Sequence, residues 1–396
     1  MDRKVWRLTL SFILLTFLGG VAYSLYLGEN LIFYDEKEYY NLAQNIAHKG
    51  MVSLDGETPT AWRPPGYPFF LAPWISLGAT ITSLRILNFA TYAFSACLVA
   101  LLLKPYSTLA GLIGVLMMFC YPVLFFTAST LYPQTLGTTL LLLSIWLLFH
   151  KENLSYSSAI GIGAAQGFLT LMIPTFASSV IFTCLWLFTR QIAKPFLKAL
   201  TIALTAVLIL LPWSMRNYLE FNQVVFVSTN GGINLLLGNS PHTRPNSGVN
   251  TDLSEYRPST SFENEFEADK YYRNQALNYI FNNKMESLKL YGLKLLNFFN
   301  YQNEMATQSE ETPFREMLML ATYGLLVLIA VVRLMFSFRF PLNNFDYYLI
   351  LSYLFAGAFM AIFFTRIRFR LPYDPLLILL NARFIAWWLL TKFKEA

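Results

Sequence analysis

The chain has 396 residues, of which 55% are hydrophobic, 17% aromatic and only 13% charged. Soluble domains usually carry about 25% charged residues, so this composition excludes a disordered chain, a collagen-like chain and an ordinary cytosolic enzyme. The net charge of +6 is typical of membrane proteins with basic cytoplasmic loops, and it does not indicate a nucleic-acid partner. We therefore predict an all-α integral membrane protein.

Apolar runs recur along the chain, and a bilayer-spanning helix needs about 20 apolar residues. The first run follows Arg3, Lys4 and Arg7 without a convincing cleavage site, so we interpret it as a retained span rather than a signal peptide. A tight break at Pro174 either separates two spans or kinks one. The ten predicted spans are 6–27, 84–103, 107–124, 134–149, 157–172, 174–189, 196–213, 317–336, 345–365 and 371–391.

Basic residues in short loops all fall on one side of these spans, which assigns that side to the cytoplasm. They are Arg3, Lys4, Arg7, Lys104, Lys151, Arg190, Lys194, Lys198, Arg333, Arg339, Lys392 and Lys394. Both termini are then inside. The expected organisation is an N-terminal transmembrane catalytic module over 1–213, whose outer loop is 28–83, an extracytoplasmic segment over 214–316 and C-terminal transmembrane helices over 317–396. The predicted location is the plasma membrane, with the site on its outer face.

Carboxylates are unevenly distributed. Of the 23 acids, six lie between Glu29 and Glu57, twelve lie between Glu220 and Glu316, and only Glu152 lies between these two groups. Ion-coupled transporters usually keep acids inside the membrane for proton or sodium relay. The distribution therefore favours chemistry at one membrane face over ion-coupled transport.

Short helices are predicted in the outer segments. Helical spacing of apolar residues over 38–47 indicates an amphipathic helix on the membrane surface. The second outer segment has a helical middle near 264–283, and the spacing from Leu288 to Phe298 predicts a further helix at the interface.

Three carboxylates, Asp35, Glu36 and Glu38, follow the first predicted span. Asp35 and Glu38 share a face if a helix begins there. A carboxylate at the membrane surface could take a proton from an attacking hydroxyl, and two or three together could hold a divalent cation. The alternative is a helix cap, with Asp35 at the N-cap and Glu38 at the third position. Spacing alone leaves both open.

Arginines occur in two distinctive outer segments. Arg63 lies in the Pro-rich stretch 58–68, whose rigid path holds it beside aromatic rings. Arg366, Arg368 and Arg370 stand at the outer end of a span, against the positive-inside bias, and would share one side of an extended stretch. A guanidinium binds phosphate in a fork. The alternative for both segments is anchoring to lipid headgroups.

A third polar region begins at Arg216 and continues through Asn/Gly clusters at 228–234 and 238–239. Such clusters expose backbone donors that could line a sugar or phosphate pocket, although structural turns are the alternative.

Histidine and cysteine residues indicate no metal site. His48 and His242 are both external, but no ligand spacing supports zinc. Cys97, Cys120 and Cys184 all fall in apolar stretches, which argues against a disulfide framework and a cysteine-rich metal site.

In combination these segments resemble polyprenyl-phosphate-sugar-dependent glycosyltransferases of the GT-C superfamily. The similar groups are the dolichyl-phosphate-mannose protein mannosyltransferases and the bacterial aminoarabinose transferase of lipid A. The order, spacing and shared membrane side of the motifs make the combination specific over most of the chain. The motifs are Asp35-Glu36 with Glu38-Tyr39, Pro59-Thr60-Ala61 with Arg63-Pro64-Pro65-Gly66-Tyr67-Pro68, Leu211-Pro212-Trp213 with Arg216-Asn217-Tyr218 and Asn230-Gly231-Gly232, and Arg368-Phe369-Arg370-Leu371-Pro372 with Pro375-Leu376.

The resemblance implies a GT-C bundle of about ten transmembrane helices, with outer-face amphipathic helices and a small extracytoplasmic segment in the C-terminal half. It implies transfer of a sugar, with inversion, from an undecaprenyl-phosphate-linked or related donor to a glycan, lipid or cell-wall polymer. Membrane lipids are the other expected partners. The only cofactor that it leaves open is a divalent cation.

The resemblance also implies roles for individual residues. Asp35 is the implied base, and Glu36 or Glu38 would assist it or bind the cation. The implied ligands of the donor phosphate are Arg63, Arg216, Arg366, Arg368 and Arg370. The expected substrate pocket contains Tyr39, Tyr67, Asn230 and His242.

Two departures from the family pattern bear on activity. The family often has an acid where this chain has Gln134, and an Arg near Leu171–Pro174, where this chain has Met172 and Ile173. A lipid-linked glycan flippase or transporter is the alternative from another functional class. Gln134 also keeps open a non-catalytic protein that binds polyprenyl phosphate.

Overall fold

The computed structural model describes residues 2–189, 192–258, 261–302 and 313–395. Within these ranges the secondary structure is helical, apart from one isolated bridge between Ser53 and Pro59. The all-α prediction is confirmed. Arg190, one of the predicted cytoplasmic residues, lies outside the described ranges.

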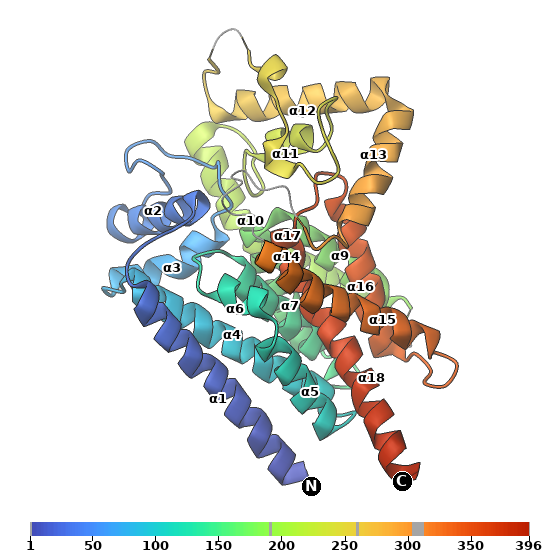
Figure 1. The fold of residues 1–396 in the computed structure, drawn as a ribbon. Helices are drawn as coiled ribbons and strands as arrows, with labels where there is room; N and C mark the ends of the chain where they lie inside the picture. The colour runs from blue at the N-terminus through green and yellow to red at the C-terminus, as the bar shows by residue number, and fades with distance from the viewer. Residues whose placement is uncertain (1, 190–191, 259–260, 303–312, 396) are drawn as a thin grey trace.

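The helices form an elongated bundle with both termini at one end and α11, α12 and α13 at the other (Figure 1). Their bounds are α1 (Asp2–Leu27), α2 (Tyr34–Lys49), α3 (Gly66–Ser76), α4 (Ile81–Leu103), α5 (Thr108–Phe119), α6 (Pro122–Ala128), α7 (Gln134–Phe149), α8 (Tyr156–Met172), α9 (Ala177–Leu187), α10 (Pro195–Phe221), α11 (Gly231–Leu237), α12 (Glu265–Asn282), α13 (Lys284–Asn297), α14 (Pro313–Met319), α15 (Leu325–Met335), α16 (Asn344–Met360), α17 (Ile367–Arg370) and α18 (Asp374–Glu395). Short 3-10 turns η1 (Pro174–Phe176), η2 (Gly248–Asn250), η3 (Ser254–Tyr256) and η6 (Leu371–Tyr373), and a π-helical turn η5 (Leu320–Gly324), complete the described elements.

Five helical segments of the described chain are long and apolar enough to cross a membrane, so the chain is a multi-pass membrane protein. The predicted count of about ten is not confirmed, although α7 and Pro174–Leu187 are shorter apolar helices. The five are Arg3–Leu27, Ile81–Leu103, Pro195–Phe221, Pro313–Met335 and Ile367–Lys392.

Prolines divide two of the apolar runs. The predicted span over 107–124 is divided, because α5 and α6 are bent apart by 67°, so this pair is either a broken span or a re-entrant loop. Pro122 has no N–H to continue the hydrogen bonding of α5. Pro174 likewise separates α8 from α9.

The bundle is built by sequential packing of α1 on α4, α4 on α5 and α7, α7 on α8, and α8 on α10. Gly163 and Gly167 permit the close approach of α8 to α10. A Cβ on Gly163 would lie 2.6 Å from the Ile202 carbonyl oxygen, and one on Gly167 would lie 2.8 Å from the Ala206 Cα. Small residues four apart are typical of close helix crossings in membranes.

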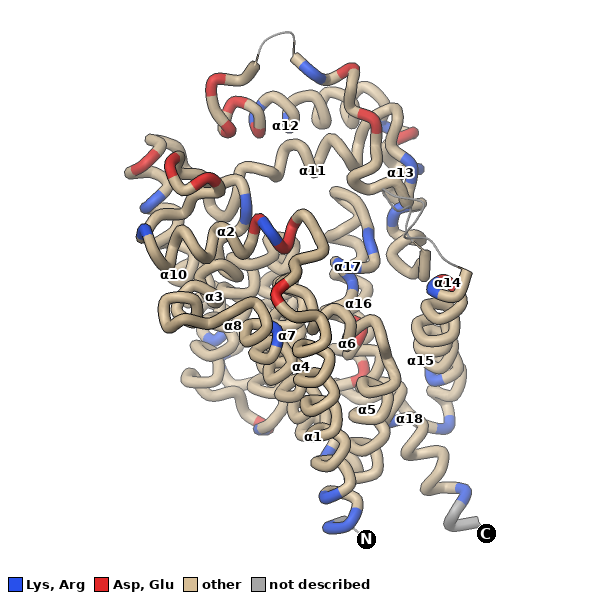
Figure 2. Tube along the Cα trace, turned by 60° about the vertical axis from the view of Figure 1, so that its left-hand side comes forward, with Lys and Arg blue, Asp and Glu red and all other residues tan. Residues whose placement is uncertain are grey.

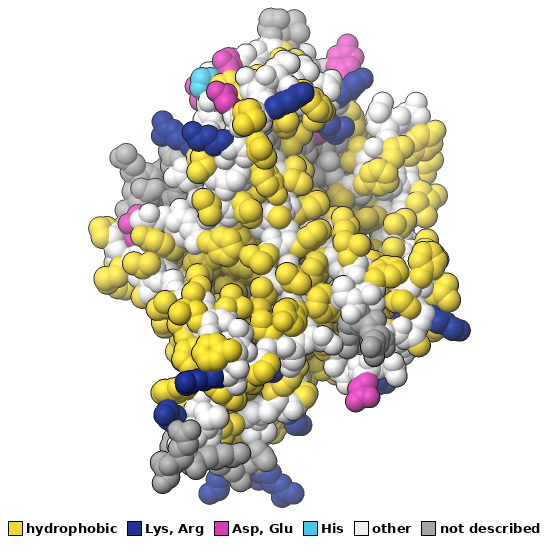
Figure 3. Space-filling model, turned by 90° about the vertical axis from the view of Figure 1, so that its right-hand side faces the viewer, with side chains coloured by type: hydrophobic (Ala, Val, Ile, Leu, Met, Phe, Trp, Pro, Cys, Tyr) yellow, Lys and Arg dark blue, Asp and Glu magenta, His cyan; other side chains and the backbone are white. Residues whose placement is uncertain are grey.

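Acidic residues gather toward one end of the molecule. Figure 2 shows most of them at the end formed by α2, α11, α12 and α13, whereas basic residues lie at both ends and few acids accompany them at the end with the termini. Figure 3 shows hydrophobic side chains over the middle of another face, and Lys and Arg toward its two ends. Exposed apolar residues such as Leu328 on α15 and Leu351 on α16 are consistent with a lipid-facing belt.

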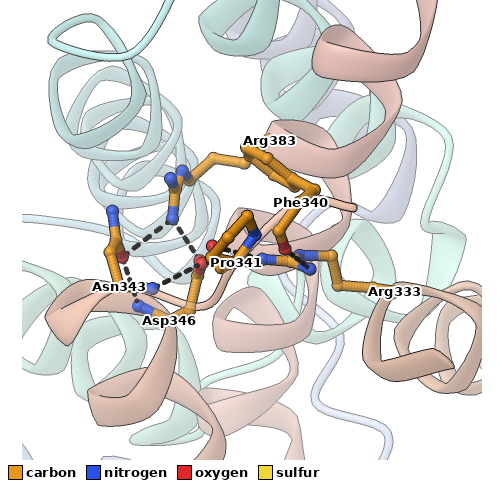
Figure 4. Close-up of polar contacts among 6 residues, drawn as sticks. All are labelled: Arg333, Phe340, Pro341, Asn343, Asp346 and Arg383. Carbon is orange, nitrogen blue, oxygen red and sulfur yellow. Dashed lines mark hydrogen bonds and ion pairs between the residues drawn. The ribbon is translucent and has the colours of Figure 1, made fainter. Parts of the chain in front are cut away.

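A buried ionic cluster joins α15, α16 and α18 (Figure 4). The carboxylate of Asp346 is 0% exposed and pairs with both Arg333, at 3.0 Å, and Arg383. Arg333 also donates to the Phe340 carbonyl oxygen at 2.6 Å, and Asn343 Oδ1 accepts the Asp346 N–H at 3.0 Å. The cluster therefore fastens the turn between α15 and α16 to α18. The sequence analysis assigned Arg333 only to a basic loop.

Candidate active site

The acidic motif lies on the first turn of α2, but its N-cap is Phe33. The alternative in which Asp35 caps the helix is therefore wrong. Glu36 does the capping: its Oε2 accepts the N–H groups of Ile32 and Phe33 at 3.1 and 3.0 Å, and its Oε1 accepts that of Leu131 at 2.8 Å. Glu36 is only 1% exposed. Both of its carboxylate oxygens therefore accept hydrogen bonds from backbone amides, which joins α2 to the segment before α7.

Asp35 is held between two guanidinium groups. Its Oδ1 accepts from Arg63 Nη2 at 2.7 Å, and its Oδ2 accepts from Arg368 Nη1 at 2.6 Å. Arg63 Nε also donates to Glu38 Oε2 at 2.6 Å. Asp35 and Glu38 thus share a helix face, as predicted. Two carboxylates face two guanidiniums, so the charges of this group balance.

The pKa of Asp35 reflects two opposing causes. Burial raises this pKa. The neighbouring Arg368 and Arg63 guanidiniums together lower it by more than burial raises it, so the net pKa lies below the ordinary value of 3.8. Burial lowers the pKa of Arg63, but Asp35, Tyr39 and Glu38 together outweigh that effect, so the net pKa is raised. Asp35 is therefore ionised at neutral pH while it is paired.

The segment that carries Arg63 is held from two directions. Glu265, at the start of α12, accepts the Thr60 hydroxyl and the Ala61 N–H, both at 2.7 Å. Arg216, on α10, donates to the Thr60 carbonyl oxygen at 3.1 Å. These contacts hold the Pro-rich stretch against both α10 and α12.

Asp35, Arg63 and Arg368 line a cavity of about 1060 Å³. Tyr39, Asn230 and Arg366, which the sequence analysis also proposed, line it too. Part of the wall is apolar and comes from distant segments. These apolar residues include Ile173, Val224, Phe226, Leu237, Val249, Phe359, Phe363 and Phe364.

A second polar wall comes from α12, which the sequence analysis did not single out for function. Asp269, Lys270, Arg273 and Asn274 all line the cavity. Asp269 pairs with Arg273 one turn along and accepts the Gly232 N–H, which fixes α12 against α11. The four-residue spacing of Asp269 and Arg273 was visible in the sequence, but such pairs are common on exposed helices.

The arginine cluster at 366–370 does not share one side. The expected extended stretch is wrong, because Ile367–Arg370 forms the helical turn α17. Arg366 and Arg368 reach the cavity, whereas Arg370 does not line it. Arg370 is 1% exposed and pairs with Asp374 at 3.1 Å, one turn further on. Arg366 is the extended residue before α17, whereas Arg368 and Arg370 lie within it, where a rotation of about 100° per residue turns them to different sides.

Three further predicted site residues lie outside the cavity lining. Arg216 stacks over Trp213, with its guanidinium carbon 5.0 Å from the ring centre. Tyr67 is fully buried, and Asn88 Nδ2 donates to its hydroxyl at 3.0 Å. His242 lies 3.2 Å from Glu255 on the surface. Their implied roles in phosphate or substrate binding receive no support from these positions.

A joint made by one buried lysine holds the chain just before Arg366 and Arg368. Lys294 of α13 is fully buried, and its Nζ donates to the carbonyl oxygens of Gly238 and Phe363 at 2.7 and 2.8 Å and to Asn239 Oδ1 at 3.2 Å. Burial lowers the pKa of Lys294 to about 7. The chain runs directly from this joint into the arginine segment.

The carboxylates proposed for a cation have other partners. Glu36 binds backbone amides, and Asp35 and Glu38 bind Arg63. Among the described residues there is no group of three His, Cys, Asp or Glu side chains arranged for a metal. These carboxylates do not fit a cation site, because Asp35 and Glu38 already pair with a guanidinium and Glu36 binds backbone amides. The divalent cation stays a prediction from the sequence.

Comparison with known proteins gives a likeness in structure alone. No protein-family model and no curated protein sequence matches the chain. Similar solved structures include two crystal structures of ArnT from Cupriavidus metallidurans, one bound to undecaprenyl phosphate and one in the apo state. Each is 12% identical and matches 95% of this chain, with TM-scores of 0.43 and 0.42 over 77% and 76% of the ArnT chain.

Proposed function

We propose that this chain is a membrane glycosyltransferase. It would move a sugar from a polyprenyl-phosphate-linked donor to a glycan, lipid or cell-wall polymer on the outer face of the plasma membrane, with inversion. The observation that carries the proposal is the carboxylate of Asp35, paired with Arg63 and Arg368 in the wall of a cavity of about 1060 Å³.

The donor phosphate would bind the guanidiniums of the cavity. Arg366 and Arg368 lie there together with Arg63. The Arg368 Nε is buried and has no hydrogen-bond partner in the described part of the chain, which leaves one donor for a ligand. Guanidiniums suit this role because they stay charged and present donors in a planar fork.

The reaction would be a single displacement. An acceptor hydroxyl oxygen attacks the anomeric carbon of the donor sugar, and the bond from that carbon to the phosphate oxygen breaks. The bonding electrons leave with polyprenyl phosphate, and the hydroxyl proton passes to Asp35. The arginines stabilise the charge on the leaving phosphate. Attack from the side opposite the leaving group inverts the anomeric centre.

Donor binding would activate the base. In the free protein Arg368 and Arg63 hold the pKa of Asp35 low. A phosphate that takes hydrogen bonds from Arg368 weakens its pairing with Asp35, so the pKa of Asp35 rises and the carboxylate becomes a stronger base. The apolar part of the wall, with residues such as Phe359 and Phe363, would receive the start of the prenyl chain.

The test is sugar transfer by purified protein in liposomes that contain native membrane lipid extract with labelled polyprenyl-phosphate sugars. Asp35→Asn should reduce labelled transfer by about 100-fold or more, the usual contribution of a general base. Glu57→Gln is the matched control, because Glu57 is an exposed carboxylate of the same outer loop.

Transfer that persists in Asp35→Asn at the wild-type rate would remove Asp35 as the base. A wild-type protein that carries labelled lipid across the bilayer without transferring its sugar would be the transporter of the alternative hypothesis. One that only retains the labelled lipid would be the non-catalytic binder.

A further inference from the structure

Several buried polar atoms around the cavity lack hydrogen-bond partners. Among the described residues, the Oε1 of Gln134 and the hydroxyls of Thr175 and Thr229 are buried and unpaired, and all three residues line the cavity. Gln134 is 5% and Thr229 2% exposed. Proteins pair nearly all buried polar groups, so a set of unpaired ones around one cavity points to partners supplied from within it.

Two of these residues belong to segments that contact Arg368 or the stretch that carries Arg63. Gln134 begins α7, and two residues before it the ring of Tyr132 lies 5.6 Å from the Arg368 guanidinium. The Thr229 N–H donates to the Ala61 carbonyl oxygen at 2.9 Å, and Ala61 lies in the Pro-rich stretch that carries Arg63. Both residues line the same cavity as Asp35 and its two guanidiniums.

Thr175 lines the same cavity from η1. Two residues before it, the side chain of Ile173 packs against the first turn of α7, where a Cβ on Gly137 would lie 3.5 Å from it. The three unpaired side chains thus come from separate segments, namely α7, η1 and the loop before α11, and they are brought together by the fold.

We propose that Gln134, Thr175 and Thr229 bind the hydroxyl groups of the donor's sugar. This inference rests on the proposed function. An amide oxygen accepts hydrogen bonds and threonine hydroxyls both donate and accept, which suits a neutral polyhydroxyl group. The anionic phosphate is matched by the arginines and the prenyl chain by the apolar wall. The transferred sugar has to lie between the base and the phosphate, in the cavity that these three residues line.

The subsite has a distinctive energetic signature. A side chain that packs the fold loses hydrogen bonds when its hydroxyl is removed, so the protein becomes less stable. The hydroxyls of Thr175 and Thr229 have no bonds to lose in the free protein. Removing them, or the Gln134 amide, should leave thermal stability unchanged or raise it while it weakens sugar recognition.

The experiment compares binding of bare decaprenyl phosphate with binding of decaprenyl phosphates that carry mannose, glucose, galactose or arabinose. The variants are Thr229→Val, Thr175→Val and Gln134→Leu in the full-length protein. Each should reduce affinity for the preferred sugar lipid about tenfold, or about 1.4 kcal/mol, with bare-lipid affinity and melting temperature maintained.

Thr139→Val is the matched control. Thr139 is equally buried in the bundle, but its hydroxyl donates to the Thr91 and Thr135 carbonyl oxygens at 3.1 and 3.2 Å. It should lower the melting temperature and leave the preference for the sugar lipid intact.

The outcomes separate the two proposals. Wild-type protein that binds none of these lipids contradicts the proposed function itself. Wild-type protein that binds every sugar lipid no more tightly than bare lipid overturns the subsite alone. Variants that retain the wild-type preference, or that lose stability as Thr139→Val does, overturn it as well.

Discussion

At the scale of single residues, the partners of each charge decide its role. Asp35 and Glu36 are adjacent in the acidic motif, yet Asp35 faces the cavity and Glu36 binds buried backbone amides. Arg368 and Arg370 diverge in the same way, because Arg370 pairs with the buried Asp374. Sequence spacing identified these four residues as a set, and their tertiary partners separate the reactive from the structural ones.

The pKa of Asp35 predicts a pH profile. Because Arg368 and Arg63 hold this pKa below 3.8 against the effect of burial, the base of the free protein stays ionised as pH falls until that lowered pKa is reached. Arg368→Gln removes one lowering charge and leaves the burial, so the pKa should rise. The acid limb of kcat/KM for transfer should therefore move to higher pH than in wild type. An acid limb at the same pH as in wild type would show that Arg368 does not lower the pKa of Asp35.

The same pairing links pH to stability. A carboxylate with a lowered folded-state pKa stabilises the protein above its unfolded pKa, and this contribution is lost as pH falls through the folded value. Arg368→Gln should therefore reduce the difference in melting temperature between neutral and acidic pH, measured by thermal unfolding in detergent.

The buried cluster at Asp346 predicts a loss of stability. Asp346→Asn leaves Arg333 and Arg383 facing each other without a counter-charge in a buried site. Breaking such a buried ion pair typically costs about 3–5 kcal/mol, which should appear as a marked fall in melting temperature. Glu152→Gln, an exposed acid at the same end of the molecule, is the control. Equal melting temperatures for the two variants would contradict a structural role for the cluster.

At the scale of elements, the cavity is an assembly of segments that other segments hold in place. Glu265 and Arg216 hold the Pro-rich stretch, and Lys294 holds the segment that leads to Arg368. None of these three contacts follows a helical or turn spacing, because each joins residues far apart in the chain. The helices α2, α12 and α13 themselves follow their local patterns and were predicted to within a few residues.

The Lys294 joint gives a prediction at this scale. Lys294→Met leaves two buried carbonyl oxygens without their donor, and each loss costs about 1–3 kcal/mol. The variant should lower the melting temperature and raise the donor KM, while kcat falls less, since Asp35 and Arg63 stand on segments that Lys294 does not touch. Lys289→Met makes the same change at an exposed position of α13. A donor KM equal to that of Lys289→Met would show that the joint does not position the arginines.

At the scale of the whole molecule, the distribution of basic residues predicts the orientation in the membrane. Basic residues with few acids mark the end with the termini, whereas the end that contains the cavity carries most of the acids together with further basic residues (Figure 2). By the positive-inside rule, applied to the short basic loops, we expect the cavity to lie outside.

Cysteine labelling checks this orientation. In a variant without Cys97, Cys120 and Cys184, a membrane-impermeant maleimide added to intact cells should label His242→Cys. It should label Lys151→Cys only after the membrane is permeabilised. The reverse pattern would place the cavity in the cytoplasm and contradict an outer-face reaction.

The sequence by itself determined the properties that depend on composition and local spacing. Apolar runs determined an all-helical membrane protein, and the clustering of acids and arginines determined which segments carry polar chemistry. Tertiary structure alone decided which of those residues meet, because a contact such as that between Asp35 and Arg368 joins positions 333 residues apart. It also decided which polar atoms remain unpaired, such as the Thr229 hydroxyl. Both depend on packing between distant segments, and local spacing carries no information about that packing.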